Sequence, residues 1–190
     1  MKRVLLLEAG EVLPPLLTTH GDYHRWFQRA LAGRCELVVL PVYRDVPLPS
    51  WRGYDAVMMT GSPLSVTEPA PWMIRAGDYL LEAAEGVPVL GVCFGHQLIG
   101  HALGTPVVKS PLGREIGTVE VDLTPAGRAD PLFAGAPERL SVQTTHEDVL
   151  QALPPGATLL AGNAHRRGSR DQRSGDAQGA ALLHRCRQEV

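Results

Sequence analysis

Short apolar runs alternate with segments of helical periodicity along the first half of the chain, and this alternation limits the folds open to it. An apolar run that ends in turn residues predicts a buried strand, and apolar residues spaced three or four apart predict a helix. Strands are expected at residues 4–8, 35–42, 55–60 and 87–92, and helices at residues 20–32, 69–85 and 95–103. Strands that alternate with helices favour a mainly parallel sheet covered on both faces. The predicted fold class is therefore α/β, a three-layer sandwich.

The second half of the chain has a different pattern. Residues 114–123 alternate in the way typical of a strand with one exposed face, and residues 140–144 and 158–161 are two further short apolar runs. We therefore expect a small antiparallel extension beside the parallel sheet. The total length of 190 residues corresponds to one domain of ordinary size.

The composition changes near His165. Residues 166–190 contain six arginines against three acidic residues, whereas the whole chain has a net charge of −2. We therefore expect a domain at residues 1–165, followed by an atypical, poorly ordered Arg-rich tail at residues 166–190. The small net charge gives no reason to expect nucleic acid as a partner, and no apolar run is long enough to span a membrane.

The cysteines and histidines give further bounds. Three scattered cysteines form neither a disulfide framework nor a cysteine-based zinc site. The short apolar run at the start of the chain is followed directly by Glu8, which fits a first strand better than a signal peptide. The predicted compartment is therefore the cytoplasm. His20 and His24 have a spacing that can hold a metal on a helix, but no third ligand is evident. We therefore predict no metal and no cofactor.

The strongest chemical signal is Gly-Val-Cys-Phe-Gly at residues 91–95, between a predicted buried strand and a predicted helix. A strand, a tight turn and a helix in this order form a nucleophile elbow, in which both glycines leave room for close backbone contacts. The turn would expose the Cys93 side chain, and the helix N-terminus would favour its thiolate. The N–H of Phe94 would face an oxyanion, with a second donor expected from the Gly61–Ser62 loop. A buried, inert cysteine is the alternative interpretation.

Residues 91–98 resemble the nucleophile motif of class I glutamine amidotransferases, whose signature is G-x-C-x-G-x-Q. Residues 54–63 look like the family's strand and oxyanion loop. Three further segments resemble a stand-alone branch of the family that is close to the amidotransferase domain of GMP synthase. They are residues 113–117, 130–133 and 145–149. The resemblance covers the chain up to residue 165, and it implies a flavodoxin-like sheet.

The resemblance also implies a reaction and a role for four residues. Cys93 would attack the side-chain carboxamide of glutamine, and the backbone N–H groups of Phe94 and Gly61 would stabilise the oxyanion. Ammonia would leave, and water would hydrolyse the γ-glutamyl thioester. Gln97, one helical turn after the nucleophile, would help to hold the glutamine.

The family's base is missing from its expected place in the sequence. In the family it is a His followed two residues later by Glu, in a Q-F-H-P-E-like segment near the C-terminus, and no such segment occurs here. His184 and Glu189 stand five apart, so we expect His184 to be exposed in the tail rather than catalytic. His146 belongs to a segment that the family uses structurally, and His96 is expected to pack in the elbow helix. The tail reflects either divergence or a shifted reading frame.

Three function classes stay open. The first is a glutamine amidotransferase-type hydrolase, with or without a working base, that passes ammonia to a separate synthase subunit or simply hydrolyses glutamine or a γ-glutamyl compound. The second is a non-catalytic ligand-binding or subunit-interaction module on the same fold, and the third is a γ-glutamyl peptidase-like cysteine hydrolase. If the family's last strands are missing, an exposed sheet edge would favour aggregation or a homo-oligomer.

Overall fold

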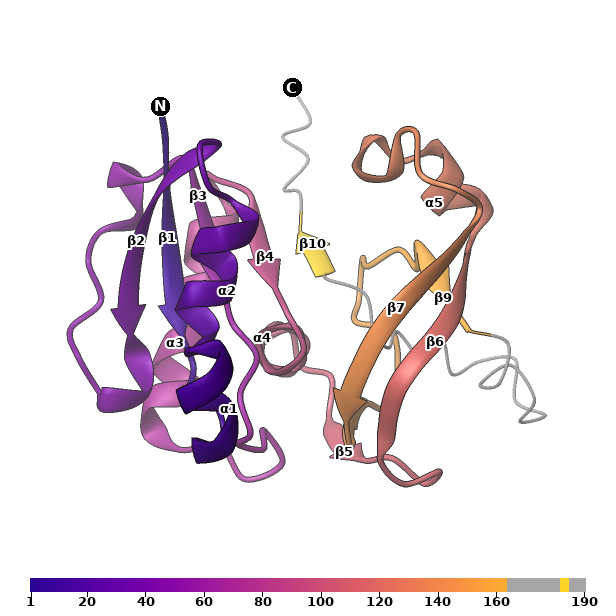
Figure 1. The fold of residues 1–190 in the computed structure, drawn as a ribbon, viewed down its shortest axis with the longest axis horizontal. Helices are drawn as coiled ribbons and strands as arrows, with labels where there is room; N and C mark the ends of the chain where they lie inside the picture. Colours follow the sequence, from indigo (N-terminus) through magenta and orange to yellow (C-terminus); the bar gives the residue numbers. More distant parts are fainter. Residues whose placement is uncertain (164–181, 185–190) are drawn as a thin grey trace.

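The computed structural model describes residues 1–163 and 182–184, arranged as Figure 1 shows. Its main sheet has four parallel strands in the order β2-β1-β3-β4 and a fifth strand that runs antiparallel beside β4. The parallel strands are β1 (Lys2–Glu8), β2 (Cys35–Pro41), β3 (Ala56–Met59) and β4 (Val89–Gly91). Each of the four overlaps a strand expected from the apolar runs. The prediction of a mainly parallel α/β sheet is therefore confirmed.

Helices cover both faces of this sheet. The chain moves from β1 to β2 in one direction and from β3 to β4 in the other, and because such crossovers are right-handed, their helices lie on opposite faces. α1 (Pro14–His20) and α2 (Tyr23–Ala30) lie in front of the sheet in Figure 1, and α3 (Pro71–Ala84) lies behind it. α4 (Phe94–Ala102) follows β4 directly. These three layers and the strand order are those of the flavodoxin-like fold.

The core lies mainly between the sheet and α3. Leu5 and Leu7 of β1 are fully buried, as expected for a central strand with both faces covered. On α3 the buried positions Met73, Ala76 and Leu80 recur every three or four residues and face this core. The buried strands fix the positions of their carboxyl ends, where ligands bind in sheets of this kind.

The prediction of one helix at residues 20–32 is wrong in where the helix begins and how far it extends. Gly21 has a φ of +74°, which ends α1 at His20, and Asp22 then begins α2 by accepting a hydrogen bond from the Tyr23 N–H at 2.8 Å. His20 and His24 therefore lie on two different helices, and the four-residue spacing does not place them on one helix face.

The second half of the chain forms the antiparallel extension. β6 (Glu115–Leu123) pairs with β7 (Arg139–His146) along its length and with β9 (Ala161–Gly162) at its end, and β5 (Val107–Lys109) pairs with β8 (Asp148–Leu150). The remaining short elements are α5 (Pro125–Ala129) and the 3-10 turns η1 (Val42–Arg44), η2 (Trp51–Gly53) and η3 (Pro131–Phe133). The long alternating strand was predicted, whereas β5 and β8 were not, because runs of three residues carry too little pattern.

The edge of β4 is not left open over its whole length. β10 (Leu182–His184) runs antiparallel to β4, with Leu182 opposite Gly91 and His184 opposite Val89. The rest of the expected Arg-rich tail, residues 166–181 and 185–190, lies outside the described residues, so its poor order and the boundary at residue 165 stay predictions. Within the part of the chain that the structure describes, every helix is too short or too polar to cross a bilayer.

Candidate functional site

The turn between β4 and α4 holds Cys93 in an unusual backbone conformation. Its φ is 51° and its ψ is −107°, and Cys93 is one of two non-glycine residues with positive φ among those described. A positive φ is costly for a side chain with a Cβ and persists only where the surrounding structure imposes it. This strained turn is the geometry of a nucleophile elbow, and it leaves the Cys93 side chain exposed.

Two glycines make this turn sterically allowed. A Cβ on Gly91 would lie 2.5 Å from the carbonyl carbon of Gly95, and a Cβ on Gly95 would lie 2.8 Å from the carbonyl oxygen of Met59. Real Cβ atoms do not approach backbone so closely, so neither position accepts a larger residue without moving β3, β4 or α4. The steric reason proposed for both glycines of the motif is therefore confirmed.

Cys93 opens into a cavity of about 340 Å³ at the carboxyl ends of β3 and β4. This volume is at the lower end of the roughly 300–1,000 Å³ found for small-molecule sites. α2 forms one wall, the elbow with α4 and the loop after β3 forms the second, and β7 with β8 forms the third. The cavity brings together Gly61, Cys93 and Gln97, three of the predicted site residues.

The two residues expected to supply the oxyanion donors both lie close to Cys93, and their role as donors stays a prediction. The Phe94 N–H donates a hydrogen bond toward the Cys93 thiolate, and a Cβ on Gly61 would be 3.6 Å from the Cys93 Cβ. Thr60, fully buried between these elements, donates from its hydroxyl to the Gly61 carbonyl at 2.8 Å and accepts from the Ala9 N–H at 3.0 Å. These two bonds tie the loop after β3 to the chain that follows β1.

The expectation that Cys93 is held as a thiolate does not agree with its surroundings. Although the side chain is exposed at the cavity, the nearby walls remove part of its hydration, and this desolvation raises the pKa of the Cys93 thiol. The negative charge of Asp148 raises the same pKa further, and the Phe94 N–H hydrogen bond lowers it by less than burial raises it. Burial therefore opposes formation of the Cys93 thiolate, and the proposed attack calls for a group that takes the proton.

Gln97 is buried and hydrogen-bonded to the third wall of the cavity. Its side-chain Nε2 donates to the backbone carbonyl of Asp148 at 2.7 Å, which ties α4 to β8. The Asp148 carboxylate is itself buried, accepts from the Ser65 hydroxyl and lies 2.9 Å from the Lys109 Nζ. Gln97 therefore has a structural bond in addition to its place on the cavity wall, and its role in holding substrate stays a prediction.

Two histidines line the cavity among the described residues. His96 is 6% exposed, and burial, with a smaller effect from the nearby His146, lowers its pKa to about 4. His96 is therefore neutral near pH 7. The Nε2 of His146 lies 3.5 Å from the Oε2 of Glu115, directly across the β6–β7 pair.

His184 is not delivered to the cavity by the strand that carries it. Because β10 runs antiparallel to β4, its chain moves away from Cys93, and His184 pairs with Val89 at the opposite end of β4. Successive strand residues rise about 3.3 Å, so the four steps from Val89 to Cys93 place the backbone of His184 roughly 13 Å from the backbone of Cys93. The expectation that His184 is not the base stays a prediction, and Glu189 lies outside the described residues.

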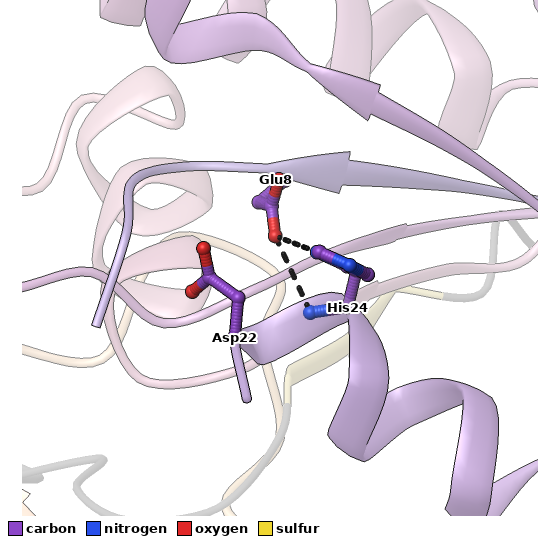
Figure 2. Close-up of side chains that lie close together, drawn as sticks. All are labelled: Glu8, Asp22 and His24. Carbon is purple, nitrogen blue, oxygen red and sulfur yellow. Dashed lines mark hydrogen bonds and ion pairs between the residues drawn. The ribbon is translucent and has the colours of Figure 1, made fainter. Parts of the chain in front are cut away.

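One group of described residues could hold a metal ion, although no metal was predicted. Ligand atoms of Glu8, Asp22 and His24 lie within 4.8 Å of one another, at the end of β1 and the start of α2 (Figure 2). The Nδ1 of His24 is 2.6 Å from Glu8 Oε1, and Asp22 Oδ1 accepts from the Tyr23 and Val12 N–H groups. These bonds explain the cluster as a link between α2 and β1.

Sequence reasoning missed the aromatic wall of the cavity and its acidic residue. Tyr23, Trp26 and Phe27 of α2 face the elbow, and Asp148 comes from β8, more than fifty residues after Cys93. The helix periodicity that includes Tyr23 and Phe27 predicted a helix here but not the element that it covers. Asp148 stands in the recognised segment at residues 145–149, where its type and position were the available signal.

Comparisons with known proteins agree with this architecture. The model of the family described as "Glutamine amidotransferase class-I" matches residues 21–173. The chain is 37% identical over 153 residues to the glutamine-hydrolyzing GMP synthase of Thermomicrobium roseum, covering 76% of this chain and 27% of that protein. It is 32% identical over 132 residues to one subunit of the glutamine-hydrolyzing GMP synthase of Saccharolobus solfataricus, covering 70% of this chain and 66% of that relative.

A solved structure extends the likeness to three dimensions. The crystal structure of a glutamine amido transferase from Methylobacillus flagellatus superposes with a TM-score of 0.66 at 27% identity, covering 86% of this chain and 61% of that chain. The chain spans about a quarter of the length of the T. roseum protein, so its similarity is to one portion of that protein.

Proposed function

Because this chain belongs to the class I glutamine amidotransferase family, we propose that it hydrolyses the side-chain amide of glutamine, or of a related γ-glutamyl compound, with Cys93 as the nucleophile. The observation that carries this proposal is the strained elbow, which exposes Cys93 in the cavity beside two backbone donors. Strain of this kind is maintained by the surrounding fold and is characteristic of functional sites. The relatives named as glutamine-hydrolyzing enzymes support glutamine as the substrate.

The proposed reaction has two stages. The Cys93 sulfur loses its proton and attacks the amide carbon, and the N–H groups of Phe94 and Gly61 stabilise the negative oxygen of the tetrahedral intermediate. The amide nitrogen gains a proton and leaves as ammonia, which gives a γ-glutamyl thioester. Water then attacks the thioester, releases glutamate and restores the thiol.

Gln97 and Asp148 are proposed to shape the substrate side of the cavity. The buried Asp148 carboxylate lies at the third wall of the cavity, where the Lys109 Nζ at 2.9 Å and the Ser65 hydroxyl hold it in place. The bond from Gln97 to the Asp148 carbonyl holds that wall at a fixed distance from the elbow. Gln97, on the cavity wall, is therefore proposed to help to hold the glutamine, and Asp148 is proposed to position Gln97 and its wall.

The proposed acceptor of ammonia is a separate synthase subunit. The support is the similarity to a relative that is itself named as one subunit of a GMP synthase. The proposal predicts faster glutamine hydrolysis when the matching synthase chain and its other substrates are added. If the rate of glutamine hydrolysis is the same with and without the synthase chain, the activity is simple amide hydrolysis.

The decisive experiment compares ammonia and glutamate release by the wild-type chain and by Cys93→Ala. The wild type is expected to release the two products in equal amounts, and the variant is expected to fall to the level without enzyme. Cys35→Ser, which changes a thiol in β2 outside the cavity, is the matched control and should keep wild-type activity. Equal release by the wild type and Cys93→Ala would overturn the proposal.

Binding without turnover is the second candidate, and the raised pKa of the Cys93 thiol favours it. A thiol that keeps its proton is a poor nucleophile, so the cavity could act as a ligand-binding module on the same fold. Calorimetry with millimolar glutamine separates the two candidates. Heat of binding without ammonia release supports the binding module. A result with no heat of binding and no ammonia release would exclude both candidate functions.

A further inference from the structure

One histidine of the cavity lining has a carboxylate neighbour, and the proposed reaction has not yet given this pair a use. His146, the last residue of β7, lines the same cavity as Cys93, and its side chain is 10% exposed. Glu115, the first residue of β6, is its direct cross-strand neighbour. The β6–β7 register therefore holds the two side chains together, as expected for opposite residues of an antiparallel pair.

The geometry of this pair is that of an oriented imidazole. The Nε2 of His146 is buried, lies 3.5 Å from Glu115 Oε2 and has no hydrogen-bond partner within residues 1–163 and 182–184. The Glu115 carboxylate is held from its other oxygen, because the Asn163 side chain donates to Oε1 at 3.2 Å. A carboxylate close to one ring nitrogen can orient the ring, and Nδ1 is then the nitrogen that would exchange protons with the cavity.

We propose that His146, oriented by Glu115, is the proton-transferring residue of the Cys93 site, a role that the family resemblance assigns to a C-terminal histidine. This inference rests on the proposed function, since it supplies the base that function needs. His146 Nδ1 accepts the Cys93 proton as the C–S bond forms, and it then donates that proton to the leaving nitrogen as the C–N bond breaks. In the second stage it accepts a proton from the attacking water and returns one to the sulfur.

The other titratable groups around the cavity fit the assignment to His146. His96, on α4, has its pKa lowered to about 4 by burial and cannot hold a proton near neutral pH. Asp148, on β8, already faces Lys109 and Ser65, and burial raises the pKa of Tyr23, on α2. Of the described residues that line the cavity, His146 thus combines an imidazole with a carboxylate neighbour.

The proposal is tested through the reactivity of Cys93 itself, which needs no turnover. Alkylation of the Cys93 peptide by iodoacetamide is followed by mass spectrometry from pH 5.5 to 9 in the full-length chain. A base that takes the thiol proton gives substantial Cys93 reactivity near pH 7. In His146→Gln the alkylation rate near pH 7 is expected to fall about tenfold, and the curve of rate against pH should shift to higher pH. Glu115→Gln should shift it in the same direction by less. His101→Gln, which changes a histidine of α4 outside the cavity lining, should leave it unchanged.

Ammonia release gives the second readout. Loss of a general base typically costs a factor of 100 or more, so His146→Gln should reduce Cys93-dependent kcat by about 100-fold with a smaller change in KM. If Cys93-dependent release and the alkylation profile both match the wild type, His146 is not the base and the proposed function survives. If the wild type releases no more ammonia than Cys93→Ala, the proposed function fails, and the alkylation profile alone then decides whether His146 takes the Cys93 proton. Glu115→Gln, with its unfolding midpoint measured, covers the case in which His146→Gln does not fold.

Discussion

At Cys93 the backbone and the surroundings have opposite effects on reactivity. The elbow places the sulfur in the cavity at the cost of a positive φ, whereas the cavity walls raise the pKa of the thiol and so disfavour its thiolate. An exposed nucleophile with a raised pKa is inactive until another group removes its proton. The residue that most needs explanation is therefore the base, and this is why the pair of His146 and Glu115 matters.

Gly95→Ala tests the packing of the elbow at the residue scale. The new Cβ would lie 2.8 Å from the Met59 carbonyl oxygen, which is backbone and cannot turn aside. Overpacking of this kind costs about 1–3 kcal/mol, so the urea midpoint should fall and Cys93 reactivity should change. Gly53→Ala is the matched control, because no atom lies within 4 Å of its new Cβ. Equal midpoints for both variants would contradict the steric account.

Single residues were predictable where the sequence encodes a local constraint. The two glycines and the exposed Cys93 followed from a strand, a turn and a helix in adjacent segments. The direction of the Cys93 pKa did not, because it depends on walls supplied by α2 and β8, which lie far away in the sequence. The helix N-terminus alone predicts a lowered pKa, and desolvation outweighs it.

At the scale of elements, α2 is the part of the site most dependent on its N-terminal cap. Asp22 is buried and accepts from the Tyr23 and Val12 N–H groups, so it both begins α2 and ties it to the chain after β1. Asp22→Ala should lower the free energy of unfolding by about 1 kcal/mol or more. Because α2 carries Tyr23, Trp26 and Phe27 into the cavity, KM for the amide substrate should rise as well.

A second capping aspartate provides the control. Asp130 accepts from the Leu132 N–H at the start of η3, which does not line the cavity. Asp130→Ala should therefore reduce stability with KM unchanged. A rise of KM in both variants would mean that the effect of Asp22 comes from general destabilisation rather than from the position of α2.

α4 carries a pH dependence of stability through His96. The pKa of His96 is lowered from 6.5 to about 4 in the folded chain, mainly by burial. Between these values the unfolded chain binds a proton that the folded chain does not, so stability falls as pH falls from about 6.5 to 4. The full loss is on the order of 3 kcal/mol, and His96 has no effect above this range.

Unfolding free energies of the wild type and His96→Gln across pH 4–7 measure this contribution. The variant should lose stability less steeply toward pH 4, and the difference between the two curves isolates His96. His101→Gln, on the same helix, should follow the wild type. Parallel curves for the wild type and His96→Gln would show that His96 is not buried in its neutral form.

The elements that the sequence predicted are the long ones. β1, β2, α3 and β6 each contain enough residues for a clear period, and all four overlap their predicted ranges. The break at Gly21 was missed because the apolar spacing continues across it, and β8 was missed because it has three residues. These two omissions are the reason that the aromatic wall and Asp148 were not assigned to the site.

At the scale of the whole molecule, β10 decides whether the main sheet ends in an open edge. The parallel strands end at β4, and β10 pairs with it over three residues. An unpaired β4 would present free backbone groups next to the elbow, a template for pairing with a second copy. The homo-oligomer predicted from sequence therefore depends on whether this short strand stays in place.

Two truncated chains separate the effect of β10 from that of the residues around it. A chain that ends at Asn163 removes β10, whereas a chain that ends at His184 keeps it. The shorter chain is expected to unfold at a lower urea concentration, and to elute earlier from a sizing column as its concentration rises. The reason is that β4, which contains the buried Val89, becomes an unpaired edge strand. The chain that ends at His184 should behave like the full length. If the two truncated chains have the same midpoint and the same concentration-independent elution, the pairing of β10 with β4 adds nothing to the fold, and the edge of β4 must be protected in another way.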